Sequence, residues 1–194
     1  FEAGAHADVH LPGGLVRSYS LAGDPRDPGH WLLGVLNEPQ GRGGSRALHE
    51  RVRVGDLLEV GPVRNAFPLA PQAGHSLLLA GGIGITPIKA MAHTLSARGQ
   101  SFELHYCARS PRHAAFLDEL VSLVPPDRLH LHFDGGDPAR GLDIAALLRA
   151  PADGTHLYYC GPAGFMQACA GASAHWAAGT VHCEHFKAPA PAPS

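Results

Sequence analysis

One junction near the middle of the chain constrains the fold more than any other stretch. Residues 77–88 read LLLAGGIGITPI, an apolar run followed by glycines and then by a segment containing a proline. An apolar run without alternation is typical of a strand that is buried on both faces of a parallel sheet. Pro87 suits the first turn of the helix that follows, because an N–H there has no partner within the helix. The junction therefore predicts strand, glycine loop and helix, the unit of a doubly wound sheet.

The rest of the second half repeats this alternation of strand and helix. We predict strands over residues 76–80, 102–107, 129–133, 155–160 and 180–185, with helices over 87–98, 113–123, 143–149 and 163–177. Strands that alternate with helices build a parallel sheet with helices on both faces. Residues 74–187 are therefore predicted to form an α/β nucleotide-binding domain.

The first half has a different pattern, rich in glycine and proline. Short apolar runs at 5–11, 15–21, 31–37 and 57–63 are typical of antiparallel strands, as in a β-barrel. A short helix is predicted over 45–52, and FPLAPQAG at 67–74 resembles an inter-domain connection. We therefore expect a β-barrel domain over residues 1–70, followed by the α/β domain and by a proline–alanine linker over 188–194.

Composition excludes several classes of function. The formal net charge of −2 gives no electrostatic reason to expect nucleic acid or an anionic membrane as partner, and no apolar run could span a membrane. The cysteines lie at positions 107, 160, 169 and 183 and have no CxxC spacing, so we expect no zinc or iron–sulfur site here. We expect them instead to be reduced thiols of a cytoplasmic protein. His130 and His132 share one face of a predicted strand, but the 14 histidines are otherwise scattered and no metal site is expected.

The candidate ligand-binding residues lie where predicted parallel strands end. Gly82 and Gly84 would let the backbone approach a phosphate at the start of the helix, although a simple tight turn also uses such glycines. Cys160, in the stretch CGP, ends a strand on the same edge of the sheet, where ligands of such sheets bind, although a core thiol is the alternative. Arg109 follows another strand and is either a phosphate ligand or an ordinary surface arginine.

Three signals occur in a fixed order: RSYS at 17–20, GGIGITP at 81–87 and YYCGP at 158–162. In this order they resemble the ferredoxin–NADP⁺ reductase superfamily over nearly the whole chain. The chain looks most similar to the phthalate dioxygenase reductase group, which includes vanillate O-demethylase reductases. The stretches that carry this closer resemblance are EPQGRGGSRALHE at 38–50, HYCARSPRHAAFLDEL at 105–120 and EHF at 184–186.

The resemblance implies a flavin site in the first half. Arg17 of the RxYS motif, with Ser18 beside it, would bind a flavin phosphate, Tyr19 would lie against the isoalloxazine ring, and Ser20 would place its hydroxyl near flavin N5. A guanidinium suits a phosphate and a phenol suits a flat ring. Gly43, Gly44 and Ser45 would form the second phosphate clamp. Phe186 would be the aromatic residue that covers the flavin. FMN is favoured, with FAD left open.

The resemblance also implies a nicotinamide site in the second half. Thr86 and Cys160 would lie beside the nicotinamide and, with Ser20, would tune the reaction. The remaining dinucleotide contacts would come from Gly82, Gly84, Arg109, Gly161, Pro162 and Met166. NADH is favoured, although Arg109 and Arg112 could accept the extra phosphate of NADPH.

The implied function is hydride transfer from NADH to FMN in the reductase component of a Rieske-type aromatic-ring oxygenase or demethylase. A barrel of this family has about six strands and the group carries a 2Fe–2S domain. We therefore expect the first strands to precede Phe1, leaving the barrel incomplete, and the cluster domain to follow the linker. The alternatives are a stand-alone flavin reductase or diaphorase, and a dinucleotide-binding module without redox function.

Overall fold

The computed structural model describes residues 1–186, and the predicted linker over 188–194 lies outside these described residues. The first half is built on a three-stranded antiparallel sheet in the order β2-β1-β3, with β1 at Ala5–Leu11, β2 at Leu15–Ser20 and β3 at Arg64–Asn65. Alternate residues of β1 are buried, as expected for a strand with one face on a core. The helix α1 spans Gly44–Arg51 and confirms the predicted short helix.

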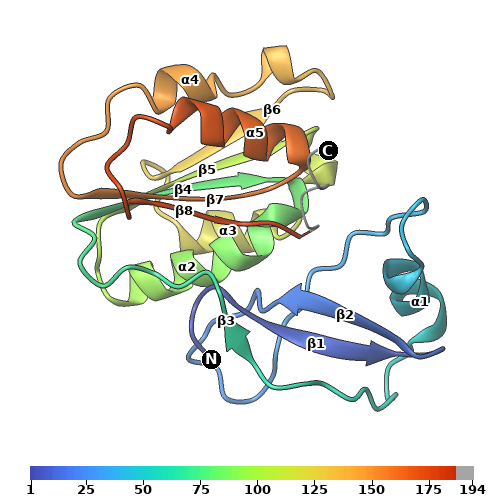
Figure 1. Cartoon of the computed structure of the whole chain (residues 1–194). Coiled ribbons are helices and arrows are strands. Elements are labelled where there is room, and N and C mark those ends of the chain that lie inside the picture. Colours follow the sequence, from blue (N-terminus) through green and yellow to red (C-terminus); the bar gives the residue numbers. More distant parts are fainter. Residues whose placement is uncertain (187–194) are drawn as a thin grey trace, which may run out of the picture.

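The second half is a five-stranded parallel sheet in the order β6-β5-β4-β7-β8, which confirms the doubly wound fold class. Figure 1 shows α2 and α3 on one face of this sheet and α4 and α5 on the other. The strands are β4 at His75–Gly81, β5 at Phe102–Ala108, β6 at Leu129–Phe133, β7 at Thr155–Cys160 and β8 at Val181–Glu184. The helices are α2 at Ile85–Ala97, α3 at Leu117–Leu123, α4 at Ile144–Leu147 and α5 at Ala163–Ala172.

The two helix boundaries that differ most from the predictions do so because of local geometry. The helix predicted from residue 113 begins only at Leu117, since Phe116 adopts a left-handed backbone conformation with φ of 60°. The helix predicted to run to residue 177 ends at Ala172. After it, the indole of Trp176 donates to the carbonyl of Leu148 at 2.9 Å, which holds the following turn against α4.

The strands predicted over 31–37 and 57–63 are wrong. Each segment makes only one isolated bridge, Leu33 with Leu21 and Val60 with Val9. The second segment is interrupted at Pro62, which has no N–H to continue a ladder. The first leaves the sheet at Gly34 to pack against the α/β half, as described below. The small sheet therefore has three strands where about four were expected.

The two halves share one hydrophobic core. Ala3 and Phe67 of the first half are buried in the same cluster as the residues of α2 and of the parallel strands. The backbone N–H of Ala70 donates to the hydroxyl of Tyr158 at 2.8 Å. The segment 67–74, expected as a connection, therefore begins as part of the packed interface. Among residues 1–186, no helix is long and apolar enough to cross a lipid bilayer.

Candidate functional site

Arg17 and the start of α1 lie in direct contact. A Cβ added to Gly44 would fall 2.5 Å from Cγ and 2.7 Å from Nε of Arg17, so a side chain at this position would displace Arg17 from the helix. The guanidinium donates to the carbonyls of Val16 and Arg42, each at 2.7 Å, which anchors it beside the helix. Residues far apart in the sequence thus place a fixed cation at a helix N-terminus.

The N-terminus of α1 itself carries the features of an anion site. Gly43 precedes the helix with φ of 81°, no side chain caps the helix, and its first turn holds no acidic residue. Free backbone N–H groups and the helix dipole attract a phosphate at such an end. Ser45 Oγ accepts the N–H of Glu38 at 3.1 Å, which leaves its own O–H to donate. The residues present therefore fit a phosphate group.

Side chains of β2 alternate between the two faces of the small sheet. Arg17 and Tyr19 share one face, where burial raises the pKa of the Tyr19 phenol and the nearby Arg17 opposes that shift. Ser18 points to the other face, where its hydroxyl donates to Asp8 at 2.5 Å. Arg64 binds the same carboxylate. The hydroxyl of Ser18 is thus engaged away from Arg17, and its predicted role at the flavin is not favoured by this placement.

Ser20 at the end of β2 reaches across to the other half of the molecule. Its buried hydroxyl donates to Oε2 of Glu184, the last residue of β8, at 3.1 Å. The other oxygen of Glu184 lies 3.7 Å from Nδ1 of His6. Glu184 pairs in register with Cys160 on the neighbouring strand β7. The contact therefore brings the RxYS strand and the end of the parallel sheet to one interface.

The Glu184 carboxyl is held in an unusual state by its surroundings. Only 13% of its side chain is exposed, and burial raises its pKa to about 7, with the Ser20 hydrogen bond acting in the opposite direction. Glu184 can therefore hold a proton at neutral pH. Burial, with smaller contributions from Glu184 and Cys183, also raises the pKa of Cys160, which keeps this fully buried group a neutral thiol.

The glycine loop packs against the end of β7. A Cβ on Gly84 would lie 2.1 Å from the carbonyl oxygen of Cys160, and one on Gly161 would lie 3.1 Å from Cα of Gly81. Gly82 adopts φ of 52°, with open space where a side chain would be. The loop and the CGP stretch thus form one surface at the carboxyl ends of the strands, where parallel sheets bind ligands.

Thr86, in the first turn of α2, lies at the contact between the halves. It is buried, its hydroxyl donates to the carbonyl of Ile83 at 3.1 Å, and a Cβ on Gly34 would fall 2.6 Å from its methyl group. One turn further along, Lys89 donates to the carbonyl of Ala22 at 3.1 Å and pairs with a carboxylate of α3 at 2.7 Å. Polar and steric contacts of α2 therefore fix the first half against the second.

The remaining predicted residues differ in their surroundings. Pro162 is the N-cap of α5 and lies beside the loop, since a Cβ on Gly81 would be 2.9 Å from its Cδ. Phe186 is 44% exposed. Arg109 is exposed and lies against Gly136, whose added Cβ would be 3.2 Å from its Nε. Met166 is buried in the core beneath α5, a position that does not favour its predicted contact with a dinucleotide.

A surface hollow extends the candidate site on the side of α3. It has a volume of about 490 Å³ and is lined by Pro111, Arg112, Ala114, Phe116, Leu117, Asp118 and Glu119. Phe116 connects it to the interface, because a Cβ on Gly34 would lie 3.0 Å from its ring. The hollow therefore offers room for part of a ligand on the α3 side of the interface, where Gly34 lies close to both Phe116 and Thr86.

Sequence reasoning missed three residues that the structure brings to this interface. Glu184 was noticed only as part of the EHF stretch, and the structure adds its bond to Ser20. Gly34 and Lys89 carried no motif, since their contacts join segments that are far apart in the sequence. Apolar neighbours around Lys89 in its helix were the one available signal in the sequence for the burial of its ammonium group.

Comparison with known proteins agrees with this geometry. Residues 78–171 match the oxidoreductase NAD-binding domain family. The tert-butanol monooxygenase / tert-amyl alcohol desaturase reductase subunit of Aquincola tertiaricarbonis is 55% identical, over 96% of this chain and 55% of that protein. Vanillate O-demethylase oxidoreductase of Pseudomonas sp. (strain HR199 / DSM 7063) is 52% identical, over 96% of this chain and 60% of that protein. The solved structure of phthalate dioxygenase reductase has a TM-score of 0.92 at 40% identity, over 96% of this chain and 58% of that one.

An antiparallel flavin-type β-domain followed by a parallel NAD-binding domain defines the class of ferredoxin reductase-like oxidoreductases. Within that class, the chain is similar over nearly its whole length to phthalate dioxygenase reductase and to vanillate O-demethylase oxidoreductases. The chain spans 55–60% of the length of the relatives described above.

Proposed function

We propose that this chain carries the flavin and NADH sites of a reductase and passes hydride from nicotinamide C4 to flavin N5. The observation that carries the proposal is the hydrogen bond from Ser20 to Glu184. It places the end of the predicted flavin strand beside Cys160 and the glycine loop of the NAD-binding domain. Two flat rings can react by hydride transfer only when they are held in contact, and a site between the halves provides that arrangement.

FMN is the proposed flavin because its terminal phosphate fits the clamp formed by Arg17 and the N-terminus of α1. The clamp brings the Arg17 side chain against Gly44, and the free backbone N–H groups and the Ser45 hydroxyl belong to the same first turn of α1. If FAD were bound instead, its second phosphate and its adenosine would have to extend beyond the N-terminus of α1. NADH is proposed over NADPH, in keeping with the family group, and Arg109 would then contact the dinucleotide backbone.

The chain's own residues have distinct proposed roles. Tyr19 would support the flavin ring, and Phe186 would shield the ring from water. Thr86 and Cys160 present buried, neutral groups that exclude water from the reacting rings. Glu184, with its pKa raised to about 7, holds a proton that it can exchange with the Ser20 hydroxyl. The flavin, when bound, accepts two electrons and releases them singly.

The electron acceptor is proposed to be a 2Fe–2S domain and then a Rieske-type oxygenase component. The solved relative is described as modular, with electron transfer from pyridine nucleotides to 2Fe–2S, and other relatives are reductase subunits of oxygenases. The four free cysteines of this chain agree with the reducing cytoplasm that the sequence indicates.

The test is to titrate the purified chain with FMN or FAD and then to add NADH or NADPH without oxygen. We expect FMN to bind more tightly than FAD, and NADH to bleach the flavin absorbance faster than NADPH. Arg17→Gln should weaken FMN binding about tenfold or more, because it removes the cation and keeps a side chain of similar reach. Arg53→Gln, at an exposed arginine outside the clamp, is the matched control and should bind normally.

The same experiment, followed by addition of free flavin or of a 2Fe–2S ferredoxin, separates the alternatives. Nucleotide binding without any flavin binding would leave only a non-redox dinucleotide module. Flavin reduction that passes electrons to free flavin, but not to a 2Fe–2S ferredoxin supplied in solution, would favour the stand-alone reductase or diaphorase.

A further inference from the structure

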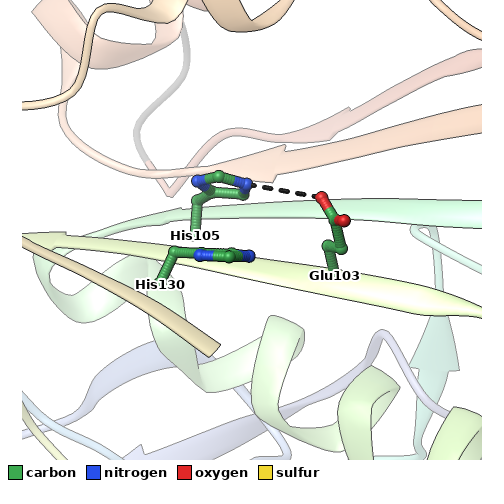
Figure 2. Close-up of side chains that lie close together, drawn as sticks. All are labelled: Glu103, His105 and His130. Carbon is green, nitrogen blue, oxygen red and sulfur yellow. Dashed lines mark ion pairs between the residues drawn. The ribbon is translucent and has the colours of Figure 1, made fainter. Parts of the chain in front are cut away.

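Three potential metal ligands gather on the parallel sheet, outside the site described above. Glu103 and His105 lie two residues apart on β5, and His105 pairs in register with His130 on β6. Their side chains therefore share one face of the sheet, the face that α4 and α5 cover. One ligand atom from each residue lies within 4.8 Å of the others. Figure 2 shows the two imidazole rings one above the other, with the carboxylate beside them.

Two nitrogen atoms of this cluster have no hydrogen-bond partner within the described part of the chain. They are Nε2 of His105 and Nε2 of His130, and both are buried. The nearest carboxylate oxygen of Glu103 is 3.7 Å from Nε2 of His105, too far for a hydrogen bond. Buried polar atoms are almost always satisfied, so two neighbouring orphans that face one carboxylate indicate a missing ligand.

The hydrogen bonding of the His105 ring suits metal binding. Its Nδ1 lies 3.0 Å from Nε2 of His132. When Nδ1–H donates in that hydrogen bond, the lone pair of Nε2 is left free toward Glu103. A metal-binding histidine usually has its second nitrogen held in this way.

We propose that Glu103, His105 and His130 bind one divalent first-row transition-metal ion, with Zn²⁺ as the best match. Two imidazoles and one carboxylate are a common protein ligand set for zinc, with water in the fourth position. Magnesium and calcium are excluded because they prefer oxygen ligands throughout. His132 acts as a positioning residue for the ring of His105.

The ligand atoms must move closer together to hold the ion. Tetrahedral zinc ligands at about 2.1 Å from the metal lie about 3.4 Å from one another, whereas these atoms spread over as much as 4.8 Å. The side chain of Glu103 is 44% exposed and can swing inward. The His105 and His130 rings are stacked with centroids 4.5 Å apart, so one ring must tilt, and Nε2 of His130 has no hydrogen bond to lose.

The site lies away from the nucleotide-binding edge of the sheet. Glu103 and His130 are the second residues of their strands, whereas the glycine loop and Cys160 are at the carboxyl ends. A bound ion would join the edge strand β6 to β5 without contacting the residues proposed for hydride transfer. Its expected effect is therefore stabilisation of the sheet edge.

The test is a calorimetric titration of the metal-free full chain with Zn²⁺. We expect one tight site per chain, which Glu103→Gln weakens about 10–100-fold and His130→Gln weakens at least as much. His182→Gln is the matched control, because His182 and His156 form a similar pair, with a 3.0 Å N···N contact and stacked rings, but belong to no three-ligand group in the described residues. This variant should bind Zn²⁺ like the parent chain.

Thermal unfolding provides the second readout. Zn²⁺ at about 100 times its dissociation constant should raise the Tm of the parent chain and of His182→Gln by about 5–10 °C, with a smaller rise for Glu103→Gln. Equal Zn²⁺ affinity in the parent and Glu103→Gln chains would overturn the proposal, as would a folded parent chain that binds no Zn²⁺. Because Glu103 is half-exposed, this variant decides the matter even if His130→Gln does not fold.

Discussion

Replacement of Glu184 by glutamine should change how the stability of the protein depends on pH. The folded-state pKa of Glu184 is raised from its usual 4.5 to about 7 by burial. A carboxyl with a raised pKa favours the folded state while it is protonated, and this contribution is lost as pH rises from the unfolded pKa through the folded one. Glutamine is uncharged throughout, keeps the shape of the side chain, and can still accept the Ser20 hydrogen bond.

The size of the effect follows from the shift. A shift from 4.5 to about 7 corresponds to a full penalty of about 3 kcal/mol once Glu184 is ionised. Part of this penalty is already present at about pH 5, where the unfolded carboxyl ionises. The stability of Glu184→Gln relative to the parent chain should therefore grow by about 2–3 kcal/mol between about pH 5 and about pH 8.5.

Urea unfolding of both chains at the two pH values measures this difference. Glu50→Gln, at an exposed carboxylate on α1, is the matched control and should show no such growth. A stability difference between Glu184→Gln and the parent that stays constant with pH would refute the assignment of a buried, proton-holding Glu184. So would a difference that shrinks as pH rises.

Two further substitutions test the contacts that shape the site. Gly84→Ala would place a methyl group 2.1 Å from the Cys160 carbonyl, so we expect a loss of about 1–3 kcal/mol in urea unfolding and slower NADH-driven flavin reduction. Gly164→Ala, on α5 with open space around it, should instead be neutral or stabilising by up to about 1 kcal/mol. Lys89→Met removes the hydrogen bond to the Ala22 carbonyl and should lower the free energy of unfolding by about 1–3 kcal/mol. Unchanged urea midpoints for Gly84→Ala or Lys89→Met would contradict the packing described.

The α/β half could be predicted from the sequence because its strands and helices follow local periodicity. The buried run before Gly81 and the helix after it have the expected type and order. The boundaries that failed depend on tertiary contacts. Phe116 adopts a left-handed backbone conformation beside the interface, and the segment around Gly34 leaves the small sheet to pack against the α/β half. The sequence near these residues does not indicate either effect.

Some features of the candidate site could likewise be predicted from the sequence, and others depend on contacts made only in the folded chain. Motif resemblance was sufficient to pair Arg17 with the glycines that open α1, and the structure places them in contact. It could not show that Ser18 is bound to Asp8, because the alternation of β2 and the position of a second strand decide that contact. The proton-holding state of Glu184 also depends on burial, which only the assembled halves create.

The position of Phe67 has a consequence for how the molecule comes apart. Its ring is buried beside Tyr158, with centroids 6.0 Å apart, so the first half contributes to the interior of the second. Neither half can lose its structure without exposing apolar surface of the other. The two halves should therefore melt together in one cooperative step, and a separate Rossmann-like fragment starting after residue 74 would have a hole where Phe67 belongs.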